Sequence, residues 1–432
     1  MIRPTPLWRS VAVLGVAGLA LTACGGSSTK TADSTPKASD SSPAASSSAP
    51  TTTAKGDGVL KIGTLLPQTG SLAFLGPPEF AGVDLAIKDI NDAGGVNGKP
   101  VEKVDSDSGD TSTDTASQSV DRLLSNKVDA IVGAASSSVS LSVIDKITGA
   151  GVLQISPANT SPELTDYADK GLYFRTAPSD VLQGRVLGDL IAADGNSTVG
   201  ILALQDSYGT GLADNLTKSF EASGGQIVEK VIYDPKAASF ATEVGKIKAK
   251  DPEAIAVIAF DETKKIIPEL VKQGIGPDKK KIYFVDGNLA NYDKDFPAGT
   301  LKGVKGTLPG VVADDSFKKR LLTVSPKLSE FAYSPESYDA VVAVALAATA
   351  AKDDAGASIA SKMQDVTSGG TKCTTFKECA AALAAGTDID YDGVSGPIEF
   401  NEKGDPSEAT IGIYSYGADN KYTFLEGKSG KI

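Results

Sequence analysis

Short apolar runs alternate with polar, amphipathic stretches along most of this chain, and this alternation limits the folds open to it. The runs are rich in β-branched and aliphatic residues and cover 59–66, 128–133, 152–156, 198–204, 226–233, 253–260 and 281–287. Near-continuous apolar strands that alternate with helices are typical of parallel sheets that helices cover on both faces. We therefore expect an α/β protein built on doubly wound parallel sheets.

The length of the chain and its first helical pattern refine this expectation. With 432 residues, the chain is too long for one ordinary domain and long enough for two lobes with separate cores. After the first apolar run, four apolar residues recur at the spacing of one helix face: Phe80, Val83, Ile87 and Ile90. Gly94 and Gly95 follow, as glycines commonly do at the end of a helix.

The residue types that are missing exclude most catalytic chemistry. The chain has no histidine, which removes the Ser-His-Asp triad, the Cys-His pair, and histidine-ligated zinc or haem. Its three cysteines are too few for an iron–sulfur cluster or a cysteine-rich zinc site. No complete phosphate-binding glycine motif occurs either. We therefore expect a protein that is not an enzyme and that holds no cofactor and no metal.

The charge balance argues against a nucleic-acid partner. The chain has 42 Lys and Arg against 54 Asp and Glu, a formal net charge of −12, and no basic block. Binding to phosphate backbones needs clustered basic residues. Two acidic clusters resemble calcium loops but lack the closing glutamate of an EF-hand, so we interpret them as solvated loops: Asp105, Asp107 and Asp110, and Asp388, Asp390 and Asp392.

The N-terminal region is typical of an exported lipoprotein. Arg3 and Arg9 precede and flank a short apolar run that is too short to span a bilayer. It ends in Leu-Thr-Ala-Cys at Cys24, which resembles the bacterial lipobox, in which the cysteine is lipidated after cleavage. We expect 1–23 to be a signal peptide and 24–56, rich in Ser, Thr, Ala and Pro, to be a disordered tether. This predicts a body anchored at the extracytoplasmic face of the cell membrane.

The segments that follow the apolar runs are the candidate binding loops. In open α/β sheets, ligands bind outside the carboxyl ends of the strands. Ser, Thr, Asn, Gly and Asp dominate these segments, which are 67–76, 134–140, 157–161, 205–210, 261–262 and 286–288. Each one alone is also ordinary turn chemistry. Together they favour a site for a small zwitterion or polyol.

The remaining two cysteines, Cys373 and Cys379, lie six positions apart. In an exported protein, a cysteine pair left over from the lipid anchor favours a disulfide. A redox role is the alternative, but the spacing is not C-x-x-C. We expect a structural bridge that closes a short loop.

Several segments together resemble the type I periplasmic binding proteins of the leucine/isoleucine/valine-binding class, which are the substrate-binding components of amino-acid ABC importers. The resemblance covers about residues 59–432. The segments that carry it are IGTLLPQTGSLAFLG, EFAGVDLAIKDINDAGGVNGKPV, IVGAASSSVS, QISPANTSPELT, FRTAP, DSYGTGLADN and GPIEFNEKGD.

The resemblance implies a site for the head group of an amino acid. In the family, a serine in the second strand-end loop contacts the ligand carboxylate, and Ser137 stands at that position. The next loop offers a backbone carbonyl and a threonine hydroxyl, which match Ala158 and Thr160. Tyr208 matches the second-lobe tyrosine that closes over the ligand. Asp286 matches the acidic residue that pairs with the ammonium, and the second-lobe aromatic falls near Ala259 or Phe260.

The resemblance also implies two lobes joined by three crossovers. The crossovers fall near Ala177–Asp180, Gly306–Gly310 and Ser395–Glu399. We expect lobe 1 to comprise 57–178 and 308–395, and lobe 2 to comprise 179–307 and 396–432. The ligand is expected between them, with hinge motion closing the site.

The implied function is capture of a small amino-acid-like solute by a monomer and its delivery to an ABC permease. Other readings stay open at this point. The protein could be a ligand-sensing surface lipoprotein, or its solute could be an amide, urea or an aromatic acid, because such ligands occur on similar scaffolds. A carboxylate-only enzyme such as a glycosidase would need two carboxylates in one cleft, and the candidate loops are poor in acids. The last reading is a structural surface lipoprotein with an empty cleft.

Overall fold

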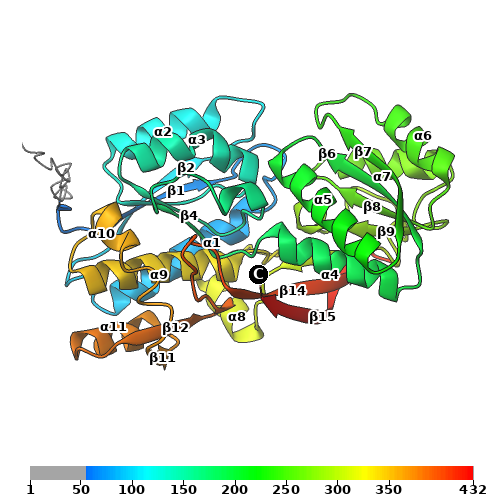
Figure 1. Ribbon diagram of the computed structural model, residues 1–432. Helices are drawn as coiled ribbons and strands as arrows, with labels where there is room; N and C mark the ends of the chain where they lie inside the picture. Colours follow the sequence, from blue (N-terminus) through cyan, green and yellow to red (C-terminus); the bar gives the residue numbers. More distant parts are fainter. Residues whose placement is uncertain (1–54, 432) are drawn as a thin grey trace, which may run out of the picture. The chain divides into compact units, whose positions relative to one another are not determined.

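The computed structural model describes residues 55–431 (Figure 1). The predicted signal peptide, Cys24 and nearly all of the predicted tether lie outside the described residues. Between residues 55 and 431, no helix combines the length and the apolar character needed to cross a membrane.

The first sheet contains five strands in the order β2-β1-β3-β4-β5, and every neighbouring pair is parallel. Its strands are β1 (Lys61–Leu66), β2 (Glu102–Asp107), β3 (Ala130–Gly133), β4 (Leu153–Ser156) and β5 (Tyr173–Arg175). Each connection between consecutive strands crosses over one face of the sheet, as parallel pairing requires.

Helices cover both faces of this sheet, which explains why β3 is apolar along its whole length. Successive side chains of a strand point to opposite faces. Ile131 therefore packs into the cluster that contains residues of α2 (Thr115–Ser125) and α3 (Ser137–Gly149). Ala130 and Val132 pack into the cluster on the other face, with residues of α1 (Gly76–Asp92) and α9 (Ser334–Ala351).

The second sheet contains seven strands in the order β15-β14-β10-β9-β8-β6-β7. Five of them are parallel, and the C-terminal hairpin of β14 and β15 adds an antiparallel edge to β10. The strands are β6 (Thr198–Leu204), β7 (Gln226–Tyr233), β8 (Ala254–Ile258), β9 (Lys281–Phe284), β10 (Lys305–Pro309), β14 (Glu408–Tyr416) and β15 (Tyr422–Lys431).

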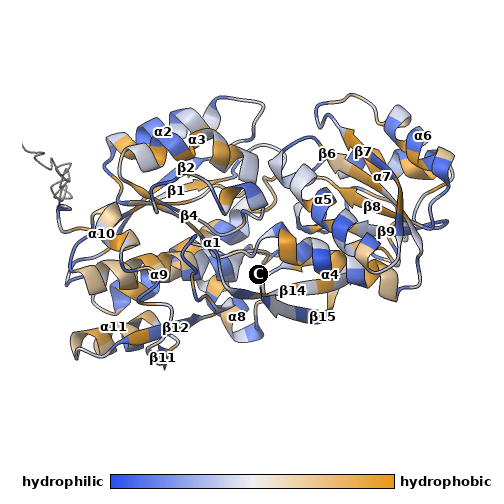
Figure 2. Cartoon of the chain, viewed as in Figure 1, coloured by the Kyte–Doolittle hydropathy of each residue, from blue (hydrophilic) through white to orange (hydrophobic). Residues whose placement is uncertain are grey.

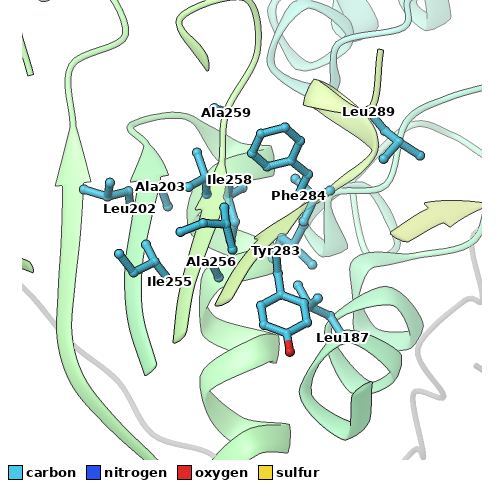
Figure 3. Packing of buried hydrophobic residues seen from close by; sticks show 14 of the residues in the cluster. Leu187, Leu202, Ala203, Ile255, Ala256, Ile258, Ala259, Tyr283, Phe284 and Leu289 are labelled. Atoms are coloured by element: carbon cyan, nitrogen blue, oxygen red, sulfur yellow. The ribbon is translucent and has the colours of Figure 1, made fainter. Parts of the chain in front are cut away.

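The core of this second sheet lies on its central strands. Leu202, Ile255 and Ile258 are fully or almost fully buried there, together with Tyr283 of β9 (Figure 3). Colouring by hydropathy shows the central strands largely apolar, β14 and β15 paler, and the covering helices polar on one side (Figure 2). The helices of this half are α4 (Asp180–Ala193), α5 (Ser207–Ala222), α6 (Ala241–Lys250) and α7 (Thr263–Lys272).

A small third sheet is formed by the part of the chain between β10 and β14 of the second sheet. It joins β11 (Thr371–Cys373), β12 (Ile389–Gly393) and β13 (Gly396–Pro397), and α11 (Phe376–Ala384) packs beside it. The remaining α-helices are α8 (Asp315–Val324) and α10 (Gly356–Ala360).

The predicted disulfide is confirmed, because Cys373 and Cys379 are bonded and link β11 to α11. By chain entropy, so short a loop stabilises the fold by about 2 to 2.5 kcal/mol.

All of the strands predicted from apolar runs are present, as β1, β3, β4, β6, β7, β8 and β9. The predicted helix over Phe80 to Ile90 is α1, and Gly94 and Gly95 follow its end with positive φ angles. The α/β fold with two parallel-sheet lobes and three crossovers is confirmed. Two crossovers were placed slightly early. Gly306–Gly310 is largely strand β10, and the connection leaves the second sheet after Pro309. Ser395–Glu399 contains β13 of the small sheet, Phe400 still packs in the core of the first sheet, and the chain joins the second sheet only at β14. The residue limits of the lobes stay a prediction.

Candidate ligand-binding site

The ends of strands from both large sheets meet around one small cavity. The loops after β1, β3 and β4 line it from the first sheet, and the segments after β6, β8 and β9 line it from the second. Its lining residues are Leu72, Leu75, Ala135, Ser136, Ser137, Ala158, Thr160, Tyr208, Phe260, Asp286, Gly287 and Tyr333. This is the position where open α/β sheets bind ligands.

The start of helix α3 forms the wall of the cavity that is suited to binding an anion. Ser136 is its N-cap, and its hydroxyl accepts a hydrogen bond from the backbone of Val139. Ser137 follows, and its Oγ accepts hydrogen bonds from the backbone N–H groups of Thr160 and Ser161, both at 3.2 Å. Because these bonds occupy its lone pairs, the Ser137 hydroxyl keeps its proton for another acceptor. The helix N-terminus adds positive dipole character to the same wall.

Thr160 adds a second hydroxyl to the same wall. Its side chain is buried, and its Oγ1 makes no hydrogen bond to any residue that the structure describes. A buried hydroxyl without a hydrogen bond costs about 1–3 kcal/mol. A ligand that accepts from this hydroxyl would remove that cost.

Hydrogen bonds within the first-sheet wall fix these loops against each other. The Ser156 hydroxyl donates to the carbonyl of Ala134 at 2.7 Å and accepts from the backbone of Asn159 at 2.9 Å. The Asn159 amide in turn donates to the carbonyls of Ala134 and Ala135, at 2.9 and 2.8 Å. The loop after β3 and the loop after β4 are therefore held as one rigid unit, which presets the positions of Ser137 and Thr160.

Asp286 forms the acidic wall on the second-sheet side. It begins the short turn after β9 and is almost completely buried. Three side chains donate to its carboxylate: Tyr208 at 2.7 Å, Tyr333 at 2.7 Å and Gln183 at 2.9 Å. Burial raises the pKa of Asp286, and these hydrogen bonds act in the opposite direction by stabilising the ionised form.

A second buried carboxylate lies close to Asp286. Asp180 opens helix α4, is fully buried, and neither of its carboxylate oxygens has a hydrogen-bond partner among residues 55–431. Burial, followed by the charge of Asp286, raises the pKa of Asp180 well above its usual value. Within the described part of the chain, no lysine or arginine lines the cavity. The site is therefore suited to a ligand that brings a positive charge.

The rest of the lining is apolar. The ring of Tyr208 stacks on that of Phe260, with ring centroids 5.4 Å apart and planes tilted by 10°. Leu72 and Leu75 of the loop after β1, and Ala135 of the loop after β3, are buried in the same lining. A ligand with one apolar portion and one zwitterionic head group matches this arrangement.

Direct hydrogen bonds join the starts of α3 and α5, which belong to different sheets. The hydroxyls of Ser138 and Ser207 lie 2.8 Å apart, and the backbone N–H of Ser207 donates to Ser138 Oγ at 3.1 Å. The Ser161 hydroxyl donates to the carbonyl of Ser207 at 3.1 Å. The two walls of the site thus contact each other through short polar side chains. Such side chains lose little conformational entropy when these contacts form.

The structure brings all of the predicted head-group residues together at this cavity, namely Ser137, Ala158, Thr160, Tyr208 and Asp286. Their contacts with a ligand stay predictions, and so does lipidation at Cys24, which lies outside the described residues. Sequence reasoning missed Gln183, Tyr333 and Asp180. Gln183 lies inside α4 and Tyr333 precedes α9, away from any strand end, and Asp180 follows β5, a strand that the apolar runs did not predict.

Comparison with known proteins supports the same assignment. Residues 59–410 match the sequence profile of the family described as Periplasmic binding protein. A Leu/Ile/Val-binding protein homolog of Brucella abortus is 27% identical over 84% of this chain and 93% of its own length. The chemotactic signal transduction system substrate-binding protein BasB of Halobacterium salinarum is also 27% identical, over 80% of this chain and 84% of its own length.

Solved structures show the same fold. A leucine binding protein from Thermotoga maritima superposes with a TM-score of 0.71 at 21% identity, over 85% of this chain and 98% of its own. A branched-chain amino acid transporter substrate binding protein from Streptococcus pneumoniae, in complex with isoleucine, gives 0.70 at 23% identity, over 87% of this chain and 100% of its own. A solute binding protein from R. palustris, in complex with benzoate, gives 0.67 at 18% identity, over 87% and 97%.

The family profile spans most of the chain, and the site lies where its strand ends meet. The resemblance predicted from the sequence is therefore confirmed, and it is to a family of substrate-binding proteins, not of enzymes. This chain belongs to the periplasmic binding protein family; it has the type I fold and is similar in sequence to leucine/isoleucine/valine-binding proteins.

Proposed function

We propose that this protein captures a small aliphatic α-amino acid between its two lobes and delivers it to an ABC importer. One observation carries the choice of ligand. The cavity places a buried carboxylate, Asp286, opposite a helix N-terminus with two available hydroxyls, those of Ser137 and Thr160. An amino-acid zwitterion complements both walls, because its ammonium meets the carboxylate and its carboxylate meets the donors.

An aromatic acid fits the same cavity less well. A benzoate-like anion would enter a cavity that already contains one buried carboxylate, that of Asp286, and would bring no counter-charge. An unpaired charge in a desolvated site is costly. The benzoate-bound relative shows that the fold accepts such ligands, but the charges of this lining favour a zwitterion.

The test of this function uses protein freed of bound ligand by unfolding and refolding. Calorimetric titration with leucine is compared with titrations of isoamylamine, which lacks the carboxylate, and 4-methylpentanoate, which lacks the ammonium. We expect leucine to bind at least about tenfold more tightly than either analogue, since each omits a charged hydrogen bond that contributes about 1.5–3 kcal/mol. Tighter binding of 4-methylpentanoate or benzoate than of leucine would contradict the proposal.

We further propose that Cys24 carries a lipid that anchors the protein at the extracytoplasmic face of the membrane. The support is the order of a positive segment, a short apolar run and Leu-Thr-Ala-Cys. Cys24→Ser should abolish incorporation of a labelled fatty acid and leave the precursor uncleaved before position 24. The double variant Cys373→Ser, Cys379→Ser is the matched control and should keep the label. Labelling of Cys24→Ser at the wild-type level would refute the anchor.

A sensing role is the second candidate, because the Halobacterium relative is a chemotactic substrate-binding protein. Uptake of radiolabelled ligand separates the two roles. Deletion of the gene abolishes uptake if the protein serves an importer. Unchanged uptake together with a lost behavioural response to the ligand would favour sensing.

A further inference from the structure

Two buried glutamates lie close together where helices α1 and α9 pack side by side (Figure 1). Glu79 of α1 is 0% exposed and Glu336 of α9 is 2% exposed. Both carboxylate oxygens of Glu79 and Oε1 of Glu336 have no hydrogen-bond partner among residues 55–431. Neither residue lines the ligand cavity. These two side chains form a buried acid pair that ligand binding does not explain.

The buried acid pair has no basic partner in the part of the chain that the structure describes. The titratable groups that face Glu336 from the surrounding elements are Glu79, Tyr333, Asp339 and Tyr414, with Glu330 and Lys318 on the open pocket that it borders. Lys318 lies instead over the ring of Phe331, and its Nζ is 3.8 Å from a carboxylate oxygen of Asp315. The negative charge of the pair is therefore not neutralised by an ion pair.

Two neighbouring carboxylates in such a setting cannot both ionise at low cost. Burial, followed by the charge of Glu336, raises the pKa of Glu79 well above its usual value, and burial also raises the pKa of Glu336. Both side chains lie in the first turn of a helix, where the helix dipole stabilises one negative charge. The pair is therefore suited to hold one proton and one negative charge.

Glu336 also contacts two of the connections between the large sheets. In the connection after β5, the Thr176 hydroxyl donates to the backbone carbonyl of Glu336 at 2.9 Å. In the connection after β10, Gly310 has a φ of 96°, and a side-chain carbon at this position would collide with Oε1 of Glu336. Hinge motion is absorbed by backbone rotation in such connections. It would therefore change the space and the hydration around this carboxylate.

We propose that Glu79 and Glu336 make lobe closure proton-linked: the proton that they share stabilises the closed arrangement, so ligand affinity falls as the pH rises. The inference rests on the proposed function for its probe ligand, leucine. Hinge opening moves both connections, lets water reach the carboxylates and allows both to ionise. Closing then takes up a proton. This contribution to affinity is present below the pKa of the open form and is lost as the pH rises through the higher pKa of the closed form.

The first test counts protons during calorimetric titration of the whole protein with leucine. Titrations at neutral pH in phosphate and in Tris, which differ in ionisation enthalpy, give the number of protons taken up. The wild type should take up more than Glu79→Gln or Glu336→Gln, by up to about one proton per ligand. Its dissociation constant should rise with pH more steeply than theirs, by up to about tenfold per pH unit. Acids of the ligand site contribute equally to all three proteins, so the difference isolates the buried acid pair.

Asp129→Asn is the matched control. Burial raises the pKa of Asp129 to about 7, and the charges of Asp354 and Asp57 act in the same direction. Asp129 precedes β3, at the end of the first sheet opposite to the connections, so its variant should keep the wild-type proton count. If Glu79→Gln does not fold, Glu79→Met is measured in its place, because an apolar side chain of similar length leaves no buried polar group unpaired.

The second test needs no ligand. Small-angle X-ray scattering of ligand-free protein at about pH 5 and about pH 8 should show a radius of gyration that increases with pH, and it should increase less in Glu79→Gln. Equal proton counts in the wild type and both glutamine variants, or an equal pH response of the radius in the wild type and Glu79→Gln, would overturn the inference and leave the proposed function standing. Failure of leucine to bind the wild type would contradict the proposed function alone, and the scattering would then decide the inference.

Discussion

Asp286→Ala is expected to weaken amino-acid binding by about thirtyfold to several thousandfold, which corresponds to about 2–5 kcal/mol. The carboxylate is buried and receives three hydrogen bonds, so it is already oriented before a ligand arrives. Removing it leaves the ligand ammonium desolvated without a partner, and leaves Tyr208 and Tyr333 without their acceptor. Calorimetric titration with leucine measures the loss directly.

Asp286→Asn and Thr160→Ala are the matched controls for this result. Asparagine keeps the size and the turn-forming capacity of Asp286 but removes its charge, so it should lose most of the same affinity. Thr160→Ala removes one neutral donor and should cost less, about 1.5–3 kcal/mol. Equal affinity of the wild type and Asp286→Asn would show that Asp286 only shapes the turn after β9. It would favour an uncharged ligand such as an amide.

The central strands of both sheets could be predicted from sequence because burial on two faces forces them to be apolar throughout. Strand β8 (AIAVI) is fully buried and has no polar position. Strand β2 was missed for the opposite reason. It lies at the edge of the first sheet and reads EKVDSD, with most positions partly or fully exposed. Its pairing with β1 uses backbone hydrogen bonds, which do not require particular side chains.

The C-terminal hairpin was missed as strands for a related reason. β15 is exposed along nearly its whole length and pairs with one neighbour, β14. Antiparallel strands of this kind owe their position to the register with a partner already in the sheet. The local sequence determines that register only weakly, so β14 and β15 could not be predicted without the rest of the sheet.

The residues of the site also fall into those that the sequence could predict and those that it could not. Ser137, Thr160, Tyr208 and Asp286 follow strands directly, and the geometry of parallel sheets brings such positions to one edge. Tyr333 reaches the site from the segment before α9, far along the chain from any strand end. Its place there depends on tertiary packing against Asp286, and a single sequence contains no short-range pattern that specifies such a contact.

The loop that carries Thr160 depends on a buried ion pair outside the cavity. Arg175 and Asp405 are 0% and 1% exposed, and their side chains are joined by bonds of 2.6 Å from Nε and 2.8 Å from Nη2. Arg175 also donates to the carbonyl of Ser161 at 2.9 Å. Thr165 bridges the pair, accepting from Arg175 at 2.9 Å and donating to Asp405 at 2.7 Å. The pair therefore ties the loop after β4 to a C-terminal segment.

Asp405→Ala is accordingly expected to lower the free energy of unfolding by about 3–5 kcal/mol, because it leaves the Arg175 guanidinium buried without a counter-charge. Urea unfolding followed by circular dichroism measures the change. Glu426→Ala is the control: it removes a partner of Lys428 in an exposed pair, at 53% and 51% exposure, and should change the free energy by no more than about 1 kcal/mol. Replacing both buried charges, as Arg175→Met with Asp405→Leu, should recover much of the lost stability, since a buried pair contributes little beyond apolar packing.

The contradicting result is an Asp405→Ala variant as stable as the Glu426→Ala control. It would mean that water or another acceptor compensates the charge of Arg175. The loop after β4 would then be held in position by Asn159 and Ser156 alone.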